Sequence, residues 1–594
     1  MNIIQDKLFS YYLNKDPSFN QPLDIPIDSF KLPINYLDND KIFKINQSVS
    51  DDLELYNSSD QCIYNTIFSP KNDFAKFNVK YWNDLYTNDI NFLIDTQNII
   101  KNFDIFDDKP CVDCEIISNM WNETKNNSEF YCKYNYLDWD ILKDFNTSSS
   151  LLLLLTIVQL SSPVIFFLAP LFILIVPFFI LKYQGINLSF NMYYQILKEV
   201  LKQHVFGKLS QGFSKDTFNN FGILYMIFCV VFYIIQIYNN LKTCYTFYNN
   251  IKQVNDYIIS LNTFINHSTQ NMNKFLKIST NCNSYNLFNN DIKKHKNNIF
   301  KLKTDIDNIS KFSHSPKKIL EFGELLKIFY LIHSNKEYEQ SIQFSIGFNG
   351  YIDNIYTLHD LYNKKHIACA KFSHKYKCKI NDQVYPPLYL TDNKVKNSFD
   401  LSSNAIITGP NASGKTTALK STIINVILTQ QFGLGFYDKC YINPYTHIHS
   451  YINIPDTSNR DSLFQAESRR CKDIIDIILA NSDPNKYRHF CIFDELYSGT
   501  NPIEAPKAGY SFLKYLNKFK NVNLILTTHY FFICKKFRKS KRIKNYKMNV
   551  LIDKDNNHTF TYNMVPGVSE LKGAIKILKD MDYPDEIINT FESI

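Results

Sequence analysis

Glycine and proline are scarce in this sequence: its 594 residues include only 15 Gly and 20 Pro. This composition excludes a collagen-like fibre and leaves little room for long flexible linkers. Arginine is scarce too, and all six arginines follow residue 459. Residues 1–10 lack an apolar stretch, so no signal peptide is expected. Because 45% of the residues are hydrophobic and 21% are charged, a disordered chain is excluded as well.

The length and the charge set broad limits on what the chain can be. A chain of 594 residues corresponds to roughly three or four domains. The net charge of +8 is small for this length. It permits contact with nucleic acid or anionic lipid but indicates neither.

Two apolar stretches predict a membrane block over residues 149–240. Residues 150–181 contain no charged residue, and residues 221–238 are eighteen further residues without charge. A helix needs about 20 apolar residues to cross the hydrocarbon core of a bilayer, so we expect a multi-pass membrane protein. The first stretch contains Pro163, Pro170 and Pro177, which predicts one kinked helix or a re-entrant hairpin. The alternative is that both stretches are buried core helices of a soluble protein.

The rest of the chain divides into three parts along the sequence. Residues 1–148 carry no usable motif and form an N-terminal domain of unknown function. In residues 241–344, apolar side chains recur every three or four positions, which predicts long helices acting as a lever or coiled coil. An ordinary helical bundle is the alternative. From about residue 345 short β-like runs begin, and residues 345–594 carry the chemistry.

The cysteines of the N-terminal part do not define a site. Four of the 13 cysteines lie there, at Cys62, Cys111, Cys114 and Cys132. Cys111 and Cys114 form a single CxxC without a second pair, so a zinc site is only weakly indicated. The sequence leaves the redox state of all four open.

A phosphate-binding loop is the strongest motif in the chain. Residues 409–416 match G-x-x-x-x-G-K-[ST], follow the apolar run 405–408 and precede a helical pattern. In this context backbone N–H groups wrap phosphates at a helix N-terminus, Lys415 neutralises the β- and γ-phosphates, and Thr416 holds Mg²⁺. The predicted nucleotide contacts are Gly409, Pro410, Asn411, Ala412, Ser413, Gly414, Lys415, Thr416 and Thr417.

Two further strand ends complete the predicted site. The apolar run 489–493 ends in Asp494 and Glu495. Asp494 is predicted to bind Mg²⁺, and Glu495 to orient or deprotonate the attacking water. The apolar run 523–527 is followed by His529, predicted to sense the γ-phosphate, because α/β sheets bind ligands at the carboxyl ends of their strands.

These motifs, in this order, resemble the ATPase domain of the MutS mismatch-repair family, within the ABC class of ATPases. The resemblance covers residues 345–594 and rests on the loop Thr408–Thr416, the S-x-F-x-x-E segment Ser462–Glu467, the stretch Asp494–Asn501, the triplet Thr528–Tyr530, and the final segment Tyr562–Ile588.

The resemblance implies an α/β P-loop ATPase with a mostly parallel sheet, acting on ATP with Mg²⁺. It implies a homodimer through the ATPase domain, with two composite sites. In each site Ser462 of one subunit contacts the nucleotide held by the other. The segment 562–588 would then supply dimer contacts.

The sequence also departs from this family. Residues 1–150 do not look like mismatch-binding or connector domains, so DNA or mismatch binding is implied by the resemblance alone. The apolar stretches predict a lipid bilayer as a partner and an ATPase domain on the cytosolic side. The alternative function is a membrane-tethered ABC-type ATPase machine with no role in mismatch recognition. A basic run at residues 535–542 could contact phosphates of DNA or lipid, or be a solvated loop.

Overall fold

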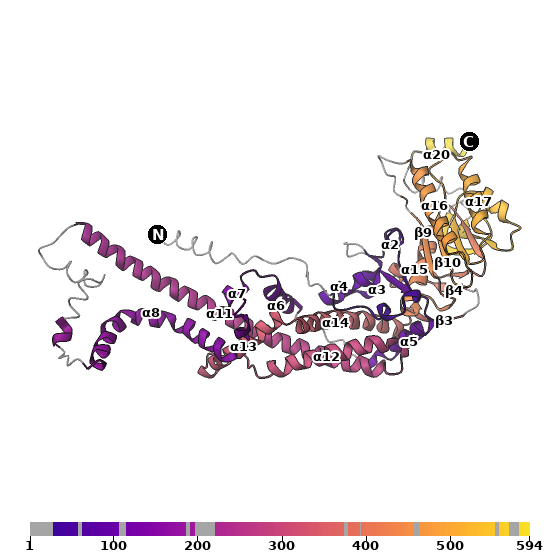
Figure 1. Cartoon of the computed structure of the whole chain (residues 1–594). Coiled ribbons are helices and arrows are strands. Elements are labelled where there is room, and N and C mark those ends of the chain that lie inside the picture. Colours follow the sequence, from indigo (N-terminus) through magenta and orange to yellow (C-terminus); the bar gives the residue numbers. More distant parts are fainter. Residues whose placement is uncertain are drawn as a thin grey trace. The chain divides into compact units, whose positions relative to one another are not determined.

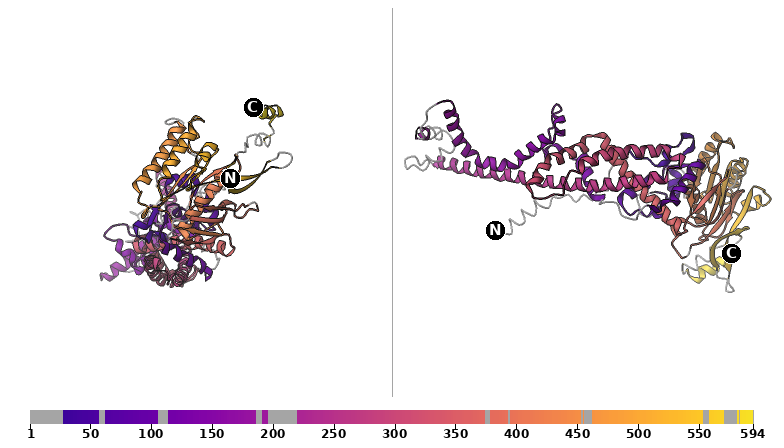
Figure 2. Two further views of the ribbon diagram at one scale, coloured as in Figure 1. Left: turned by 90° about the vertical axis from the view of Figure 1, so that its right-hand side faces the viewer. Right: turned by 90° about the horizontal axis from the view of Figure 1, so that it is seen from below.

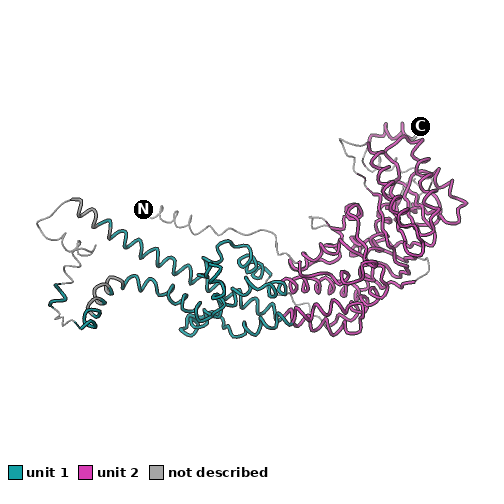
Figure 3. The backbone as a smooth tube through the Cα atoms, viewed as in Figure 1, with its two compact units in different colours: residues 1–25, 112–266, 297–342 teal, residues 26–111, 267–296, 343–594 magenta. Residues whose placement is uncertain are grey.

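The structure is a computed structural model of the chain, and the residues it describes are 28–56, 62–105, 114–185, 191–195, 220–373, 378–392, 394–452, 454, 462–552, 558–569, 581 and 583–593. The chain forms two compact units, each assembled from separated segments (Figure 3). Unit 1 contains residues 1–25, 112–266 and 297–342, and unit 2 contains residues 26–111, 267–296 and 343–594. Residues 26–111 therefore share a unit with the C-terminal region.

Unit 1 is helical, and its longest apolar stretch is one continuous helix. Helix α8 (Ser149–Tyr183) runs through all three prolines, so the stretch forms one helix and not a re-entrant hairpin. Its first turns pack on α13 (Pro316–Ser334). The helices approach closely at Gly323, where an added Cβ would lie 2.8 Å from the Cβ of Leu153. Further helices of this unit include α6 (Cys114–Lys125), α7 (Phe130–Lys133) and the 3-10 helix η4 (Lys143–Thr147).

The second apolar stretch is the beginning of a much longer helix. Helix α11 (Asn220–Ile278) contains residues 221–238 and continues without a break into the region predicted as a lever. It meets α8 near α13 (Figure 1), where the Ser162 hydroxyl donates to Asn240 Oδ1 at 2.8 Å. The rings of Phe166 and Tyr233 stack with their centroids 5.7 Å apart. The long helices expected from the periodicity are present, with α12 (Asn286–Ile306) as the second one, and their action as a lever stays a prediction.

Among the described residues, one helical segment is long and apolar enough to cross a membrane. It is Ser149–Leu168 within α8, and little of it is buried. Large apolar side chains on both helices are exposed as well, including Val164 (59%), Phe167 (65%) and Phe228 (64%). The loop between the two apolar stretches lies mostly outside the described residues.

Unit 2 is built around a twisted six-stranded sheet, seen from two further directions in Figure 2. The strand order is β13-β12-β6-β11-β10-β9, in which β12, β6, β11, β10 and β9 are parallel and only β13 is antiparallel. The strands are β6 (Asn404–Thr408), β9 (His447–Tyr451), β10 (His489–Asp494), β11 (Val522–Thr527), β12 (Ile543–Ile552) and β13 (His558–Pro566). The mostly parallel sheet expected from the sequence is present.

Helices cover both faces of this sheet. Helices α16 (Leu463–Ala480), α17 (Ala505–Leu516) and α18 (Phe531–Phe537) form one apolar core with the sheet, where Phe493 and Leu526 pack against them. The buried helix α15 (Lys415–Phe432) contacts β10 and β11. Parallel strands that are covered on both sides read as continuous apolar runs, which is why β6, β10 and β11 were recognisable in the sequence.

A second sheet and one helix differ from the sequence prediction. The five-stranded sheet has the order β5-β4-β8-β3-β7 and was not predicted. Its strands are β3 (Ala368–Phe372), β4 (Cys378–Gln383), β5 (Asn397–Asp400), β7 (Leu434–Gly435) and β8 (Lys439–Ile442). The prediction of β-like runs from residue 345 was wrong, because α14 (Lys336–Asn363) continues to Asn363. Residues 341–352 are buried on every side, so no helical stripe marks them.

The N-terminal segment of unit 2 packs directly on α15. Its elements are β1 (Ile42–Lys44), α2 (Gln47–Leu53), α3 (Ile63–Phe68), α4 (Asp73–Trp82), β2 (Leu85–Thr87) and α5 (Ile90–Lys101). The Gln431 amide donates to the carbonyl oxygen of Trp82 at 2.6 Å and accepts from the Tyr64 hydroxyl at 2.9 Å. The Gln430 amide donates to the carbonyl oxygen of Thr87 at 3.1 Å. An unpaired buried amide costs about 1–3 kcal/mol, so these bonds fix the N-terminal segment to the end of α15.

The cysteines described in the structure are free thiols. They include Cys62, Cys114 and Cys132 of the N-terminal part. Cys111 lies outside the described residues, so the structure does not test the CxxC as a pair.

Candidate functional site

The loop between β6 and α15 has the backbone of a phosphate-binding loop. Gly414 caps α15 with φ +90°, a left-handed conformation that favours glycine. A Cβ on Gly409 would lie 2.7 Å from the Ser413 hydroxyl, so the loop is tightly turned there. The Ser413 hydroxyl itself donates to the carbonyl oxygen of Pro410 at 2.7 Å. The free N–H groups at the start of α15 face the loop, as anion binding at a helix N-terminus requires.

Lys415 is buried at the centre of the loop. Its Nζ donates to the carbonyl oxygens of Gly409 at 3.1 Å and Pro410 at 3.2 Å. It lies 3.2 Å from His529 Nε2 and 3.9 Å from Glu495 Oε1. Burial lowers the pKa of Lys415, although Glu495 and Asp494 oppose this shift. An anionic group in the loop would compensate the buried charge.

Asp494, at the end of β10, links β10 to the neighbouring strand β11 and to helix α15. Its Oδ2 accepts from the Thr416 hydroxyl at 2.8 Å, and its Oδ1 accepts from the Thr527 hydroxyl at the end of β11. One carboxylate therefore touches both the first turn of α15 and the neighbouring strand. The hydroxyl and carboxylate oxygens of Thr416 and Asp494 are the ligand type that Mg²⁺ prefers.

The described side chains around this pair offer no larger metal cage. In the described part of the chain, no cluster of three or more His, Cys, Asp or Glu side chains could hold a metal ion. This agrees with the chemistry of Mg²⁺ in nucleotide sites, where one or two protein oxygens, water and phosphates complete the coordination. The residues present therefore fit a Mg²⁺ ion that arrives with a nucleotide.

Glu495 and His529 form a second charged pair beside Lys415. His529 Nε2 lies 2.7 Å from Glu495 Oε1, and the hydrogen bond from His529 lowers the pKa of Glu495. Glu495 has φ +49°, which is rare for a residue with a side chain. Such strain is commonly kept where function needs a side chain in an unusual direction.

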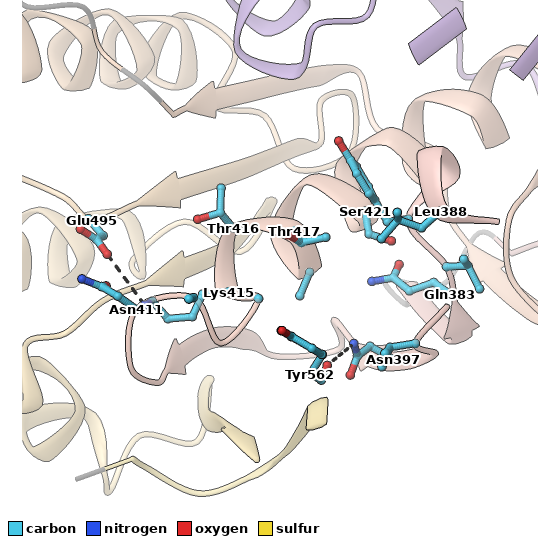
Figure 4. A pocket seen from close by; sticks show the side chains of 16 residues that line it. Gln383, Leu388, Asn397, Asn411, Lys415, Thr416, Thr417, Ser421, Glu495 and Tyr562 are labelled. Atoms are coloured by element: carbon cyan, nitrogen blue, oxygen red, sulfur yellow. Dashed lines mark hydrogen bonds and ion pairs between the residues drawn. The ribbon is translucent and has the colours of Figure 1, made fainter. Parts of the chain in front are cut away.

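A cavity of about 600 Å³ opens beside the loop, with two chemically different ends (Figure 4). Asn411, Lys415, Thr416 and Glu495 line the charged end. The opposite end was not predicted from the sequence and is lined by Gln383, Val384, Tyr385, Leu388, Val395, Asn397, Ser421 and Tyr562. Of these lining residues, only Tyr562 lies in one of the motif segments named above, because a pocket wall requires no particular spacing.

Of the predicted residues, Ser462 is not among those that line this cavity. It caps α16 in a reciprocal capping box with Gln465. Within one chain its hydroxyl accepts from the backbone N–H of Gln465 at 3.3 Å. Its contact with a nucleotide in the partner subunit stays a prediction.

Glu467, from the same segment, ties α16 to the residues after Glu495. Its buried carboxylate accepts from the backbone N–H of Ser498 at 2.9 Å and of Gly499 at 3.2 Å. The S-x-F-x-x-E segment and the stretch after Glu495 are thereby joined.

The loop after β6, the parallel strand order and the carboxylate at the end of β10 define a P-loop α/β domain. Residues 405–594 match the family model for MutS domain V. The match supports the MutS family for this C-terminal segment, as the motifs predicted.

Curated relatives share the same segment. The DNA mismatch repair protein MutS of Parabacteroides distasonis is 28% identical over 200 residues, which cover 32% of this chain and 21% of that protein. An endonuclease MutS2 of Lactococcus lactis subsp. cremoris is 32% identical over 194 residues, covering 32% of this chain and 24% of that protein. A similar endonuclease MutS2 from Clostridium botulinum is 28% identical over 236 residues, covering 37% and 29%. The chain thus spans about a quarter of the length of these relatives.

Proposed function

We propose that this protein is a membrane-anchored ATPase of the MutS type, within the ABC class, that binds and hydrolyses ATP at composite dimer sites. The observation that carries the proposal is that Lys415, Thr416 and Glu495 line one end of the cavity, with Asp494 bonded to Thr416 and His529 paired with Glu495. The MutS domain V match and the names of the relatives add support.

The charged end of the cavity suits the phosphates, and the other end suits the base. Lys415 and the loop N–H groups would neutralise the phosphate charge. Thr416 and Asp494 would hold Mg²⁺, which supplies positive charge at the phosphate oxygens. The apolar and aromatic wall, with Tyr385, Leu388 and Tyr562, offers the surface that a flat nucleobase needs.

Glu495 is the group proposed to take the proton of the attacking water. A general base must be ionised at the working pH, and the hydrogen bond from His529 keeps the pKa of Glu495 low. His529 and Lys415 lie on the same side of this carboxylate, where they would also stabilise negative charge that develops during hydrolysis.

The composite site would require two copies of the chain. Ser462 stands at the N-terminus of α16, an end of a helix that favours negative charge. A second subunit could present it to the γ-phosphate, so that ATP closes a homodimer and hydrolysis opens it.

The membrane part of the proposal rests on α8 and α11. Both helices expose large apolar side chains along their length, and they contact each other through Ser162 and Asn240. A monomeric soluble protein rarely leaves so much apolar surface exposed. A bilayer would cover it, with the ATPase domain on the cytosolic side.

A role on DNA is the second candidate, favoured by the names of the relatives. The shared segment is domain V alone, and the matched 32% of this chain contains no predicted mismatch reader. DNA binding and mismatch recognition are therefore held as an alternative, beside a membrane machine that makes no use of DNA.

ATP turnover by the full-length protein in detergent tests these proposals. Glu495→Gln should retain ATP binding and lose turnover by roughly 100-fold or more, because a general base is removed. Lys415→Ala should lose ATP binding itself. Each protein is measured without DNA, with homoduplex and with mismatched duplex.

The DNA arms separate the two candidates. Turnover that requires Glu495 but does not respond to DNA would support the membrane machine. Turnover that rises with duplex, and more with a mismatch, would support the DNA role. If Lys415→Ala binds and hydrolyses ATP as the natural protein does, the ATPase proposal is wrong.

A further inference from the structure

One carboxylate from the N-terminal segment reaches the nucleotide domain far away in the sequence. Asp52 is in the last turn of α2, a helix that contacts β9 (Figure 1). Its Oδ2 accepts from the Ser450 hydroxyl at 2.6 Å and from the backbone N–H of Ile452 at 3.2 Å. The same oxygen lies 3.2 Å from the Arg470 guanidinium. Only 11% of the Asp52 side chain is exposed.

The partners of Asp52 bracket the stretch of chain that carries Ser462. Ser450 and Ile452 lie before it, and Arg470 lies two turns into α16, behind it. Arg470 Nε also donates to the carbonyl oxygen of Ser450 at 3.1 Å, which closes a small ring of bonds. Asp52 therefore fixes both ends of this stretch at once.

Helix α16 also links Asp52 and Arg470 to the residues that follow Glu495, the proposed general base. One turn before Arg470, Glu467 holds the N–H groups of Ser498 and Gly499. These residues follow Glu495 closely in the chain. A helix is rigid over this length, so a shift at Arg470 would also be felt at Ser462 and at the residues after Glu495.

We propose that Asp52 is a positioning residue for ATP hydrolysis. By holding Arg470 it fixes α16, and so aligns Ser462 and the segment after Glu495. Residues 26–111 thereby act as part of the ATPase, although the described ones among them do not line the cavity. This inference rests on the proposed ATPase function.

The alternative is that the pair only stabilises the fold. Removing one partner of a buried ion pair leaves an uncompensated charge and is destabilising in any protein. Burial also raises the pKa of Asp52, with the Ser450 hydroxyl and Arg470 opposing it, so holding the charge there has a cost. A purely structural role would lower stability without separating kcat from KM.

The test compares Asp52→Asn with Asp51→Asn in the full-length protein. Asp51 is the neighbouring aspartate, exposed and bonded only locally to Gln47. Asp52→Asn should lower kcat by roughly tenfold, as expected for a small misalignment of reacting groups, with KM for ATP nearly unchanged. Arg470→Lys, which keeps the charge but loses the forked geometry, should show a smaller loss of the same kind. Asp51→Asn should match the natural protein.

Hydrogen–deuterium exchange supplies a readout that does not depend on turnover. Asp52→Asn should speed exchange in residues 463–480 and 496–499 and leave α15 unchanged. Unchanged exchange in these residues would show that Asp52 does not hold α16 in place, even if the protein proved not to hydrolyse ATP. Faster exchange with natural kcat would make the contact merely structural and would also overturn the proposal. A third result is also possible, in which the natural protein shows no turnover and the variant still exchanges faster. That result would reject the ATPase proposal, while Asp52 would still be shown to hold α16 in place.

Discussion

At the scale of single residues, the pair of Glu495 and His529 makes a prediction about pH. The hydrogen bond from His529 lowers the pKa of Glu495 below its ordinary value of 4.5. Turnover should therefore persist as the pH falls to that value, because Glu495 is still ionised. His529→Ala removes the bond, so the pKa of Glu495 should rise and the acid limb of the kcat profile should move to higher pH.

The sign of the stability effect follows from the same shift. A lowered pKa means that the ionised form is favoured in the folded state. Its contribution to stability is present above the unfolded pKa and is lost as the pH falls through the folded pKa.

For the kcat profile of His529→Ala, the variant His314→Ala, at an exposed histidine of unit 1, serves as the control. An acid limb that stays in place in His529→Ala would show that His529 does not set the charge of Glu495.

The sequence motifs already marked the charged residues that the structure brings together, and the reason is physical. Phosphate binding needs a short loop with fixed spacing, so Gly409 to Thr416 are readable as a motif. Asp494 and His529 follow buried parallel strands, which are apolar along their whole length. Asp52 carries no such signal, because its partners lie 398 to 418 positions away in the chain. A long-range contact of this kind is set by the fold and not by local spacing.

At the scale of elements, the end of α15 depends on Gly433. This residue has φ +77°, and a Cβ on it would lie 2.6 Å from Gln97 Cγ and 2.7 Å from the carbonyl oxygen of Leu93 in α5. Gln97 cannot easily move, because its amide donates to the carbonyl oxygens of Ala370 and Gly433. Gly433→Ala should therefore lower the free energy of unfolding by roughly 1–3 kcal/mol beyond the cost of the left-handed backbone.

Gly185 provides a matched control for that substitution. Its φ is +81°, nearly the same, and no atom lies within 4 Å of an added Cβ. Gly185→Ala thus carries the backbone cost alone. The melting temperatures of both variants, followed by circular dichroism, should differ clearly, with Gly433→Ala lower. Equal melting temperatures would mean that α5 does not press against the end of α15.

The elements were predicted unevenly from the sequence. Long helices and buried strands gave clear patterns, which is why α11 and β10 were expected. The sequence prediction missed α14 over residues 345–363; up to residue 352 this helix is buried on every side and shows no amphipathic stripe. The strands of the second sheet, such as β7, are too short to stand out.

At the scale of the whole molecule, each unit combines segments that are far apart in the sequence. Residues 26–111 belong with the C-terminal region, and Tyr64 bonds to Gln431 across 367 positions. A division of the sequence into consecutive parts cannot show this, because composition and periodicity describe neighbours in the chain. The contacts of Asp52 with β9 and α16, and those of Gln430 and Gln431 in α15, show that the N-terminal segment is part of the fold around the proposed ATP site.

The exposed helix pair makes the last prediction, which concerns the bilayer. Val164 and Phe167 lie three positions apart on one face of α8, and both are exposed. We expect the natural protein to stay with membranes through an alkaline carbonate wash. Val164→Lys combined with Phe167→Lys should release it, because a lysine at the centre of a bilayer costs about 2.5–3.5 kcal/mol. Tyr183→Lys, at the exposed end of the same helix, should leave the protein in the membrane fraction. The contrary result would be a natural protein that is a soluble oligomer and a double variant that is a monomer. In that case the apolar faces would cover one another between copies. The proposal of a membrane anchor would then be wrong.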